Sequence, residues 1–238
     1  MPAGAAPCDN VLPALAGIAT RVKCEELGRY IAGLWETQLP QGLFWFARGV
    51  SSCKETSISR APGFSWASLA GTSKVNEATW MLTSLPEDDN TRQLFQVPDV
   101  QCDASSHNPF GLVTKASILL RGYLLPVKLK GEKGPPPCNA IILSGTLEQH
   151  VTAYMDRAVI TGMGVKMDFT CFFGFTTKEE NHLTYDKARR GTENKTTICL
   201  LLLECVGQDV YQRVGCVPEI ENEGLWLKHA KEKEFMLI

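Results

Sequence analysis

The chain has 238 residues, of which 44% are hydrophobic and 21% are charged, and its formal net charge is −2. This length allows one large domain or two small ones, and the composition excludes an intrinsically disordered chain. The basic residues gather only in two short clusters, at residues 128–133 and 187–190, so no basic stripe is present to follow a phosphate backbone. We therefore expect no nucleic-acid partner.

The sequence also lacks the signals of a membrane or secreted protein. Its longest apolar run, residues 198–206, is interrupted by Glu204 and is shorter than the ~18 residues of a membrane-spanning helix. Residues 1–13 have neither the basic start nor the apolar core of a secretory signal. The nine cysteines are scattered without a C-x-x-C pair, which is typical of free thiols. We expect a cytoplasmic protein with no membrane contact, no metal and no other cofactor.

Helical signals occupy the first 70 residues. Asp9 or Asn10 can cap a first helix that tolerates Pro13 in its first turn. The apolar residues of this helix recur with a 3.6-residue period, which predicts one buried stripe. The residues of this stripe are Leu12, Leu15, Ile18, Ala19 and Val22.

A second short helix is predicted over residues 27–36. The helical pattern then stops at Pro40 and Gly42, and an aromatic turn or short strand follows at residues 43–46. The residues of the second helix that would face inward are Tyr30, Ile31 and Leu34.

From about Ser65 onward the pattern changes to short strands, which are rich in β-branched and aromatic residues. Gly122 and Pro126 are expected to interrupt the longest of them with a bulge or an edge. Residues 131–137 and 178–195 have the composition of loops. The predicted strands cover residues 80–82, 117–129, 140–143, 158–160, 167–175, 197–206, 211–217 and 235–238.

Together these elements predict an α+β fold, in which two or three N-terminal helices pack on a mostly antiparallel, sheet-like or barrel-like β body. Residues 1–70 would form a helical, tryptophan-rich segment, and residues 71–238 would form the β-rich body. We expect the two segments to make one integrated domain.

Several short motifs follow one another in an order that resembles a known family. The N-terminal motifs are LPALAGIA at residues 12–19, YIAGLW at 30–35, LPQGLFW at 39–45 and APGFSWASLAG at 61–71. The series continues with NPFG at residues 108–111, LLRG at 119–122 and YQRVG at 211–215. It resembles the region downstream of the signalling domain in fungal heterokaryon-incompatibility (HET) proteins. One departure is Gly63-Phe64, which stands where the family usually has Ser-Trp.

This resemblance implies that the chain is the C-terminal region of such a protein without its N-terminal HET domain, because the tyrosine-rich signalling block does not occur in the sequence. Proteins of this family act in fungal non-self recognition and trigger regulated cell death. The resemblance implies a non-enzymatic, accessory or regulatory region whose partner is the signalling domain or a second copy of the chain. A small-molecule- or glycan-binding β domain and a degenerate hydrolase stay open as alternatives.

The tryptophans and glycines of these motifs have a physical role that does not depend on the resemblance. Trp35, Trp45 and Trp66 supply large apolar side chains for a hub that seats the helices on the sheet. Gly33 and Gly42 allow neighbouring segments to approach closely. We expect a structural role for this set rather than a recognition surface.

Arg121 and Arg213 each lie in strand-like sequence close to a glycine. An arginine that points inward must be paired, because an unpaired buried charge is costly. The pattern favours a structural salt bridge and leaves a ligand site as the alternative. The candidate acidic partners are Asp103, Asp156 and Glu204.

Two short patterns could suggest catalysis or metal binding. Residues 63–67 approximate the G-x-S-x-G turn of α/β-hydrolases, but no strand precedes Ser65, no helix pattern follows it, and Ala67 replaces the second glycine. The second pattern combines Cys102 and Asp103 with a nearby histidine, a combination that is more often part of a loop than of a metal site. We therefore predict no enzymatic activity and no catalytic residue.

Overall fold

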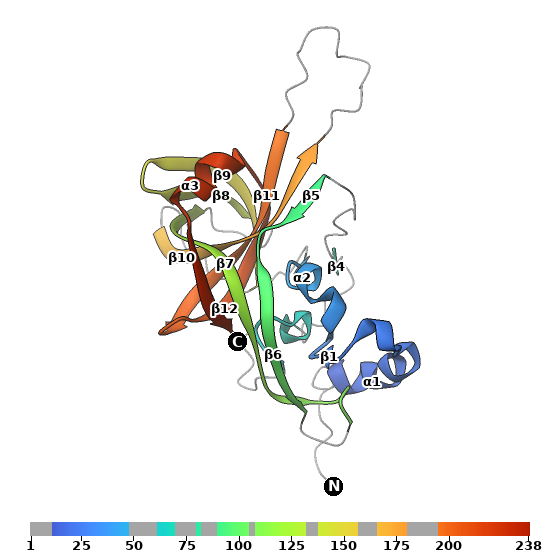
Figure 1. Ribbon diagram of the computed structural model, residues 1–238. Helices are drawn as coiled ribbons and strands as arrows, with labels where there is room; N and C mark the ends of the chain where they lie inside the picture. Colours follow the sequence, from blue (N-terminus) through green and yellow to red (C-terminus); the bar gives the residue numbers. More distant parts are fainter. Residues whose placement is uncertain are drawn as a thin grey trace.

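A computed structural model describes residues 11–47, 61–69, 80–81, 90–104, 108–131, 138–156, 166–179 and 195–238. Most of these residues lie in strands, and nine of the strands form one connected body. Figure 1 shows this body with the blue N-terminal segment at its side, next to the lower part of the long green strands β6 and β7. The predicted β-rich, mostly antiparallel fold is confirmed.

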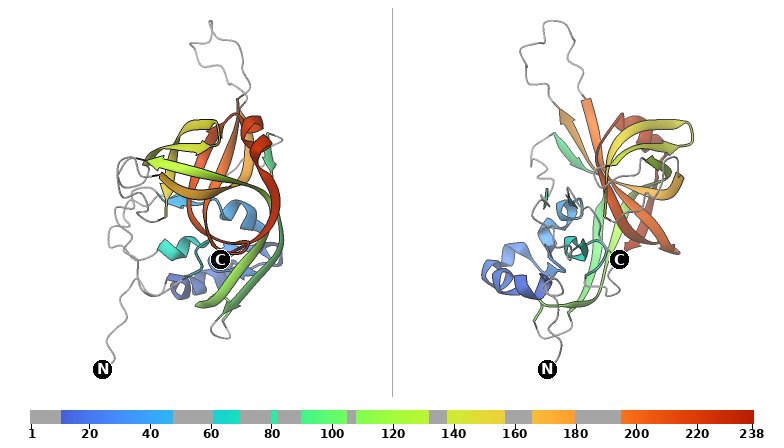
Figure 2. Two further views of the ribbon diagram at one scale, coloured as in Figure 1. Left: turned by 90° about the vertical axis from the view of Figure 1, so that its left-hand side faces the viewer. Right: turned by 180° about the vertical axis from the view of Figure 1, so that it is seen from behind.

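The sheet of the body closes on itself. β7 pairs with both β8 and β10, and the pairs β8–β9, β9–β12, β12–β11 and β11–β10 complete a ring of six strands. β13 lies beside β7 and makes the short parallel pair with β12, while β5 and β6 extend the sheet. Figure 2 shows the curvature of these strands from two further sides. The strands are β5 (Thr91–Gln93), β6 (Gln96–Ala104), β7 (Val113–Gly131), β8 (Cys138–Ser144), β9 (Leu147–Met155), β10 (Lys166–Glu179), β11 (Lys195–Gly207), β12 (Val210–Glu221) and β13 (Lys231–Leu237).

Side chains of the ring strands other than β8 are divided between two hydrophobic cores, because successive residues of a strand point to opposite faces. All six ring strands contribute to one cluster, the inner core, to which β11 adds Leu200 and Leu202. The opposite face of β11 adds Leu201 and Leu203 to a second cluster, the outer core. Because both of its faces are buried, β11 has an almost continuous apolar sequence instead of an alternating one.

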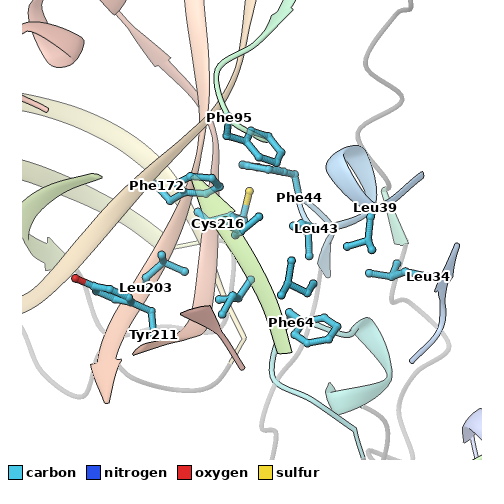
Figure 3. Close-up of a cluster of buried hydrophobic side chains, with 14 of the residues drawn as sticks. Leu34, Leu39, Leu43, Phe44, Phe64, Phe95, Phe172, Leu203, Tyr211 and Cys216 are labelled. Carbon is cyan, nitrogen blue, oxygen red and sulfur yellow. The ribbon is translucent and has the colours of Figure 1, made fainter. Parts of the chain in front are cut away.

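The outer core joins the N-terminal segment to the β body. Phe44 is fully buried there, and its ring centroid lies 5.3 Å from that of Phe175 and 5.8 Å from that of Phe95. Figure 3 shows the two sides of this core, with Leu34, Leu39, Leu43, Phe44 and Phe64 from the N-terminal segment and Phe95, Phe172, Leu203, Tyr211 and Cys216 from the body.

The N-terminal segment consists of short helices and very short strands. Its longest element, α1, has 12 residues, and among the described residues no helix is long and apolar enough to cross a membrane. The last helix of the chain lies in the body, where its Trp226 enters the inner core. The elements are α1 (Val11–Val22), η2 (Glu25–Leu27), β1 (Tyr30–Ile31), β2 (Leu34–Trp35), η3 (Glu36–Gln38), α2 (Leu39–Gly42), β3 (Phe46–Ala47), η4 (Trp66–Leu69), β4 (Trp80–Met81) and α3 (Glu223–His229).

The first helix is present as predicted, but its predicted buried stripe is confirmed only at Leu12 and Ala19. Ile18 is 61% exposed and Val22 is 54% exposed, whereas Leu12, Ala16 and Ala19 are buried. The small side chains of Ala16 and Ala19 face the rest of the protein because α1 lies close to two aromatic rings of the β1–β2 hairpin and to the ring of Phe110. The predicted caps, at residues 9–10, lie outside the described residues.

The predicted helix over residues 27–36 is wrong, because this stretch is the β1–β2 hairpin. Its two turn residues, Ala32 and Gly33, have φ angles of 50° and 99°. Positive φ at both positions is what a two-residue hairpin turn requires and what a helix does not allow. The prediction that Ile31 and Leu34 face inward is confirmed. Residues 39–42 form α2, so Pro40 begins a helical turn there instead of interrupting one.

The predicted strands at residues 140–143, 167–175, 197–206, 211–217 and 235–238 are confirmed and are longer than predicted. Gly122 and Pro126 do not break β7, which continues through both residues. At Gly122, Phe95 and Phe172 pack against the strand, and Pro126 stays in register opposite Thr170 of β10. The sequence missed β5, β6, β9 and α3, and residues 66–69, which follow the point where the pattern was expected to change to strands, form a helical turn. The predicted strand at 158–160 and the loop residues 180–194 lie outside the described residues.

Candidate functional site

Two tryptophans of the motif series lie in one set of contacts, here called the tryptophan lock. The indole N–H of Trp66 donates to the Gly33 carbonyl at 2.9 Å, and the indole N–H of Trp45 donates to the Phe64 carbonyl at 2.8 Å. A Cβ on Gly33 would lie 2.9 Å from Trp66 Nε1, so the turn and the indole fit only with glycine there. The residues of the lock are Ala32, Gly33, Trp45, Phe64, Ser65, Trp66, Asp156 and Arg213.

Arg213 of β12 connects this lock to the β body. Its guanidinium carbon lies 3.5 Å from the ring centroid of Trp45, and its Nη2 donates to the Trp45 carbonyl. Its Nη1 lies 2.7 Å from Oδ2 of Asp156, just beyond the end of β9. Arg213 is 3% exposed and Asp156 is 8% exposed, so the two charges compensate each other inside the protein. Of the three acidic partners considered from the sequence, Asp156 is the one that pairs with Arg213.

Arg121 has a different environment, although its local sequence is similar. Its Nε lies 3.1 Å from Oε1 of Glu232, and the two side chains are about half exposed. An ion pair in contact with water contributes little to stability. The structure therefore separates the two arginines, with Arg213 in the lock and Arg121 on the surface.

Trp35 and Gly42 do not belong to the lock. Trp35 lies partly buried against Tyr30 and Phe110, with ring centroids 5.1 and 6.1 Å away. Gly42 ends α2, where an added Cβ would lie 3.0 Å from a methyl group of Leu34. The three tryptophans predicted to form one hub are thus divided between two places.

The rings of Tyr30, Trp35 and Phe110 line a hollow of about 250 Å³, here called the aromatic pocket. It lies between α1, the β1–β2 hairpin, β6 and the turn after residue 108. The turn is fixed by Asn108, whose Oδ1 accepts the N–H of Phe110 at 3.0 Å. Sequence reasoning did not find this pocket, because Phe110 is distant in sequence from the hairpin rings. The side chains that characterise it are Lys23, Arg29, Tyr30, Trp35, Cys102 and Phe110.

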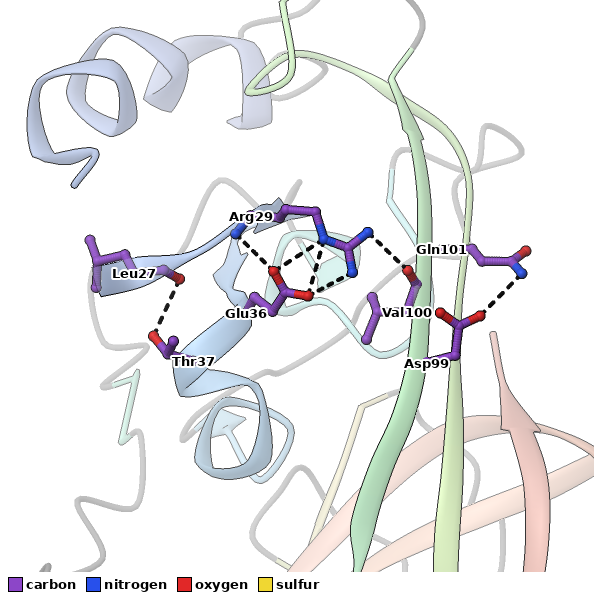
Figure 4. Close-up of polar contacts among 7 residues, drawn as sticks. All are labelled: Leu27, Arg29, Glu36, Thr37, Asp99, Val100 and Gln101. Carbon is purple, nitrogen blue, oxygen red and sulfur yellow. Dashed lines mark hydrogen bonds and ion pairs between the residues drawn. The ribbon is translucent and has the colours of Figure 1, made fainter. Parts of the chain in front are cut away.

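Arg29 holds one wall of the aromatic pocket. Figure 4 shows its guanidinium between Glu36 and the backbone of Val100, with Nη2 2.6 Å from Glu36 Oε1 and Nη1 donating to the Val100 carbonyl at 3.2 Å. Hydrogen bonds from Arg29 lower the pKa of Glu36, and the same bonds raise the pKa of Arg29. Burial raises the pKa of Tyr30, so its phenol keeps its proton at neutral pH. The hairpin is thereby fastened to β6.

The serine of the hydrolase-like pattern, Ser65, makes structural hydrogen bonds to the backbone. Ser65 is fully buried, its Oγ donates to the Ala32 carbonyl at 2.5 Å, and the same Oγ accepts the N–H of Ala67 at 3.1 Å. His150 and His229 are exposed, and the other two histidines lie outside the described residues. A hydroxyl held in this way has no path to a solvent-borne substrate. Ser65 therefore belongs to the lock.

The thiols and carboxylates form no metal site in the part of the chain that the structure describes, where no three His, Cys, Asp or Glu side chains gather. Cys102 is half-buried in the aromatic pocket, and burial raises its pKa. Cys199 and Cys216 lie with their sulfurs 3.9 Å apart in the outer core, where the hydrogen bond between the two thiols and burial raise the pKa of Cys199. All seven described cysteines are free thiols.

A second hollow, of about 580 Å³, lies over β8, β9 and β12. It occurs where β9 and β12 diverge beyond their two pairs at Tyr154 and Met155. Its lining is mainly polar and includes His150, Thr152 and Glu219.

Comparisons of the chain with models of protein families, with curated proteins and with solved structures find no match in any of the three.

Proposed function

We propose that this chain is the C-terminal accessory region of a heterokaryon-incompatibility protein, acting in the cytoplasm of a fungus in non-self recognition and regulated cell death. In this proposal the chain performs no chemistry. It holds or regulates the signalling domain by protein–protein contact, or it pairs with a second copy of itself. Its N-terminal helices and its β body work as one integrated domain.

One observation carries the proposal: the motifs that resemble this family meet in space. The motifs at residues 30–35, 39–45, 61–71 and 211–215 all contribute to the tryptophan lock. Their indole and hydroxyl donors are used on one another's backbone carbonyls, in buried or partly buried positions. Such an arrangement supports a structural role for the motifs, which is the role of a scaffold and not of a catalytic site.

The alternative of a degenerate hydrolase has no comparable support. Ser65, the one serine in a hydrolase-like pattern, contacts Ala32 and Ala67 and is fully buried. The alternative of a ligand-binding domain has a specific observation in its favour, which is the aromatic pocket.

The test uses the signalling domain of a heterokaryon-incompatibility protein in a filamentous fungus. Expression of this chain alone should leave growth unchanged. Fusion of the chain behind the signalling domain should change the rate of cell death that this domain causes, and the two purified parts should bind each other. Unchanged cell death together with no binding would refute the proposal.

A matched pair of variants tests whether the change in cell death caused by the fusion depends on the tryptophan lock. Trp66→Phe removes the indole hydrogen bond to Gly33, and Trp226→Phe removes a similar bond of 3.1 Å to the side chain of Gln149. Only the first variant affects the lock, because Trp226 lies in the inner core. We expect Trp66→Phe to weaken the effect of the fusion and Trp226→Phe to preserve it. Equal effects of both would show that general stability, and not the lock, controls the response.

A further inference from the structure

The aromatic pocket has walls that are already in place. Its rings lie at 58–68° to one another, and the centroid of Tyr30 is 5.1 Å from that of Trp35 and 5.3 Å from that of Phe110. Two small residues of α1, Ala16 and Ala19, cluster with these rings. Each ring is therefore held by its neighbours, and a ligand would find the pocket preformed.

The volume of the pocket limits the size of the ligand. Pockets for drug-sized ligands usually measure about 300–1,000 Å³. The aromatic pocket measures about 250 Å³, which suits one ring with a short substituent. Its lining is mostly apolar and aromatic, and aromatic rings pack favourably edge to face against such walls.

The charges of the lining residues determine the sign of the charge that a ligand should carry. Lys23 and Arg29 line the pocket, and no aspartate or glutamate is among its described lining residues. Arg29 is neutralised by Glu36, whereas Lys23 forms no ion pair with any residue that the structure describes. The phenol of Tyr30 likewise has ring contacts but no hydrogen bond within the described part of the chain. One positive charge and one hydroxyl donor are thus available to a carboxylate.

We propose that the aromatic pocket binds a small aromatic acid, with the ring among Tyr30, Trp35 and Phe110 and the carboxylate toward Lys23 and the Tyr30 hydroxyl. The site is independent of the proposed accessory role, which depends on the tryptophan lock. It assigns to the chain a ligand-binding function in addition to that role. The elements that surround the ligand belong to both the N-terminal segment and the β body.

The test is a titration of the full chain with phenylacetate, followed by the indole N–H resonance of Trp35 in NMR spectra and assigned with a Trp35→Phe variant. For a ligand of this size we expect a saturable shift with a Kd on the order of 1 mM. Phenethylamine, which has the same ring and the opposite charge, should cause no saturable shift. Cyclohexylacetate, which keeps the charge and lacks the aromatic ring, should bind roughly two- to tenfold more weakly.

Variants that keep the fold complete the test. Lys23→Gln should weaken phenylacetate binding roughly two- to fivefold, as expected for an exposed charge pair. Tyr30→Phe, which keeps the ring, should weaken it roughly two- to tenfold. Lys115→Gln, on the exposed side of β7 and outside the pocket, is the matched control and should bind like the unaltered chain. The proposal is overturned if phenylacetate causes no saturable shift, if phenethylamine binds equally well, or if the Lys23→Gln and Lys115→Gln variants behave alike.

Discussion

Substituting alanine for Gly174 should detach the N-terminal segment from the outer core. A Cβ at this position on β10 would lie 2.1 Å from Cζ and 2.2 Å from Cε1 of Phe44. Ordinary contacts begin at 3.4 Å, so the Phe44 ring would have to move by about 1.3 Å. The ring has no room for this movement, because the rings of Phe95, Phe172 and Phe175 surround it in a close-packed core.

The free-energy cost of Gly174→Ala lies between two limits. If the core rearranges around the Phe44 ring, overpacking destabilises the fold by about 1–3 kcal/mol. If the ring leaves the core, the loss approaches that of truncating a buried phenylalanine to alanine, about 3–5 kcal/mol. Backbone strain does not add to this cost, because Gly174 does not have a positive φ. We therefore expect a destabilisation of about 2–4 kcal/mol.

Denaturant unfolding of a double-mutant cycle separates the clash from other effects. In a Phe44→Ala background the methyl group meets no ring, so Gly174→Ala should there be neutral or slightly stabilising. Gly207→Ala is the matched control, because a Cβ at that position on β11 finds its nearest neighbour at 3.5 Å. If Gly174→Ala destabilises the chain equally with and without the Phe44 ring, the proposed packing of the N-terminal segment is wrong.

Three further changes test other parts of the structure. Ala32→Gly should cost about 1–2 kcal/mol less unfolding free energy than Ala153→Gly in the inner core, because only glycine at position 32 relieves a positive φ, which is 50° there. Equal losses of unfolding free energy in the two variants would contradict this. Arg29→Gln should lower stability by at most about 1 kcal/mol at neutral pH, since both side chains of the pair are partly exposed. The stability that the Arg29–Glu36 pair contributes should be present above pH 4.5, the ordinary pKa of glutamate, and should be lost as the pH falls through the lowered pKa of Glu36 in the fold. Melting curves of the unaltered chain and of Arg29→Gln at several pH values measure this loss. Alkylation of the unfolded chain without reductant, followed by mass spectrometry, should modify all nine cysteines, and a stoichiometric disulfide would contradict the expected free thiols.

The β body was predictable because its strands have strong local signals. β11 and β12 each combine β-branched and aliphatic residues in runs of strand length, and the sequence placed both. The β1–β2 hairpin was missed because Ile31 and Leu34 have the spacing of a helix face as well as of two paired strands. What decides between the two is the positive φ of Ala32, a residue that normally favours helices, and contacts from distant residues hold it there.

The candidate sites were predictable only in part, for the same reason. The sequence suggested Asp156 among three partners of Arg213, but it treated Arg121 and Arg213 alike. The difference between them comes from Trp45, which is 168 residues away from Arg213 along the chain and covers its guanidinium. No local pattern contains such a contact. The aromatic pocket was missed for the same reason, since Phe110 reaches the hairpin only in the folded chain.

Truncation of the three motif tryptophans to alanine should reveal their different environments. Trp45 is 1% exposed, its indole bonds to the Phe64 carbonyl, and its ring covers Arg213. Trp45→Ala should therefore cost about 3–5 kcal/mol, a large share of the roughly 5–15 kcal/mol that stabilises a whole domain. Trp66 is only partly buried but loses a hydrogen bond to Gly33, so Trp66→Ala should cost about 1–3 kcal/mol.

Trp35→Ala should be the mildest of the three changes. Trp35 is partly buried, and its ring contacts with Tyr30 and Phe110 contribute about 0.5–1.5 kcal/mol each. Thermal unfolding of the three variants measures the order directly. Trp35→Ala should in addition abolish phenylacetate binding while Trp66→Ala preserves it, as followed by the NMR signals of the ligand itself, because the first variant lacks the Trp35 indole. Three melting curves close to that of the unaltered chain would mean that the tryptophans form a recognition surface instead of a lock. A loss from Trp35→Ala as large as that from Trp45→Ala would contradict the expected order, because Trp35 is only partly buried and lies against Tyr30 and Phe110, away from the contacts of Trp45.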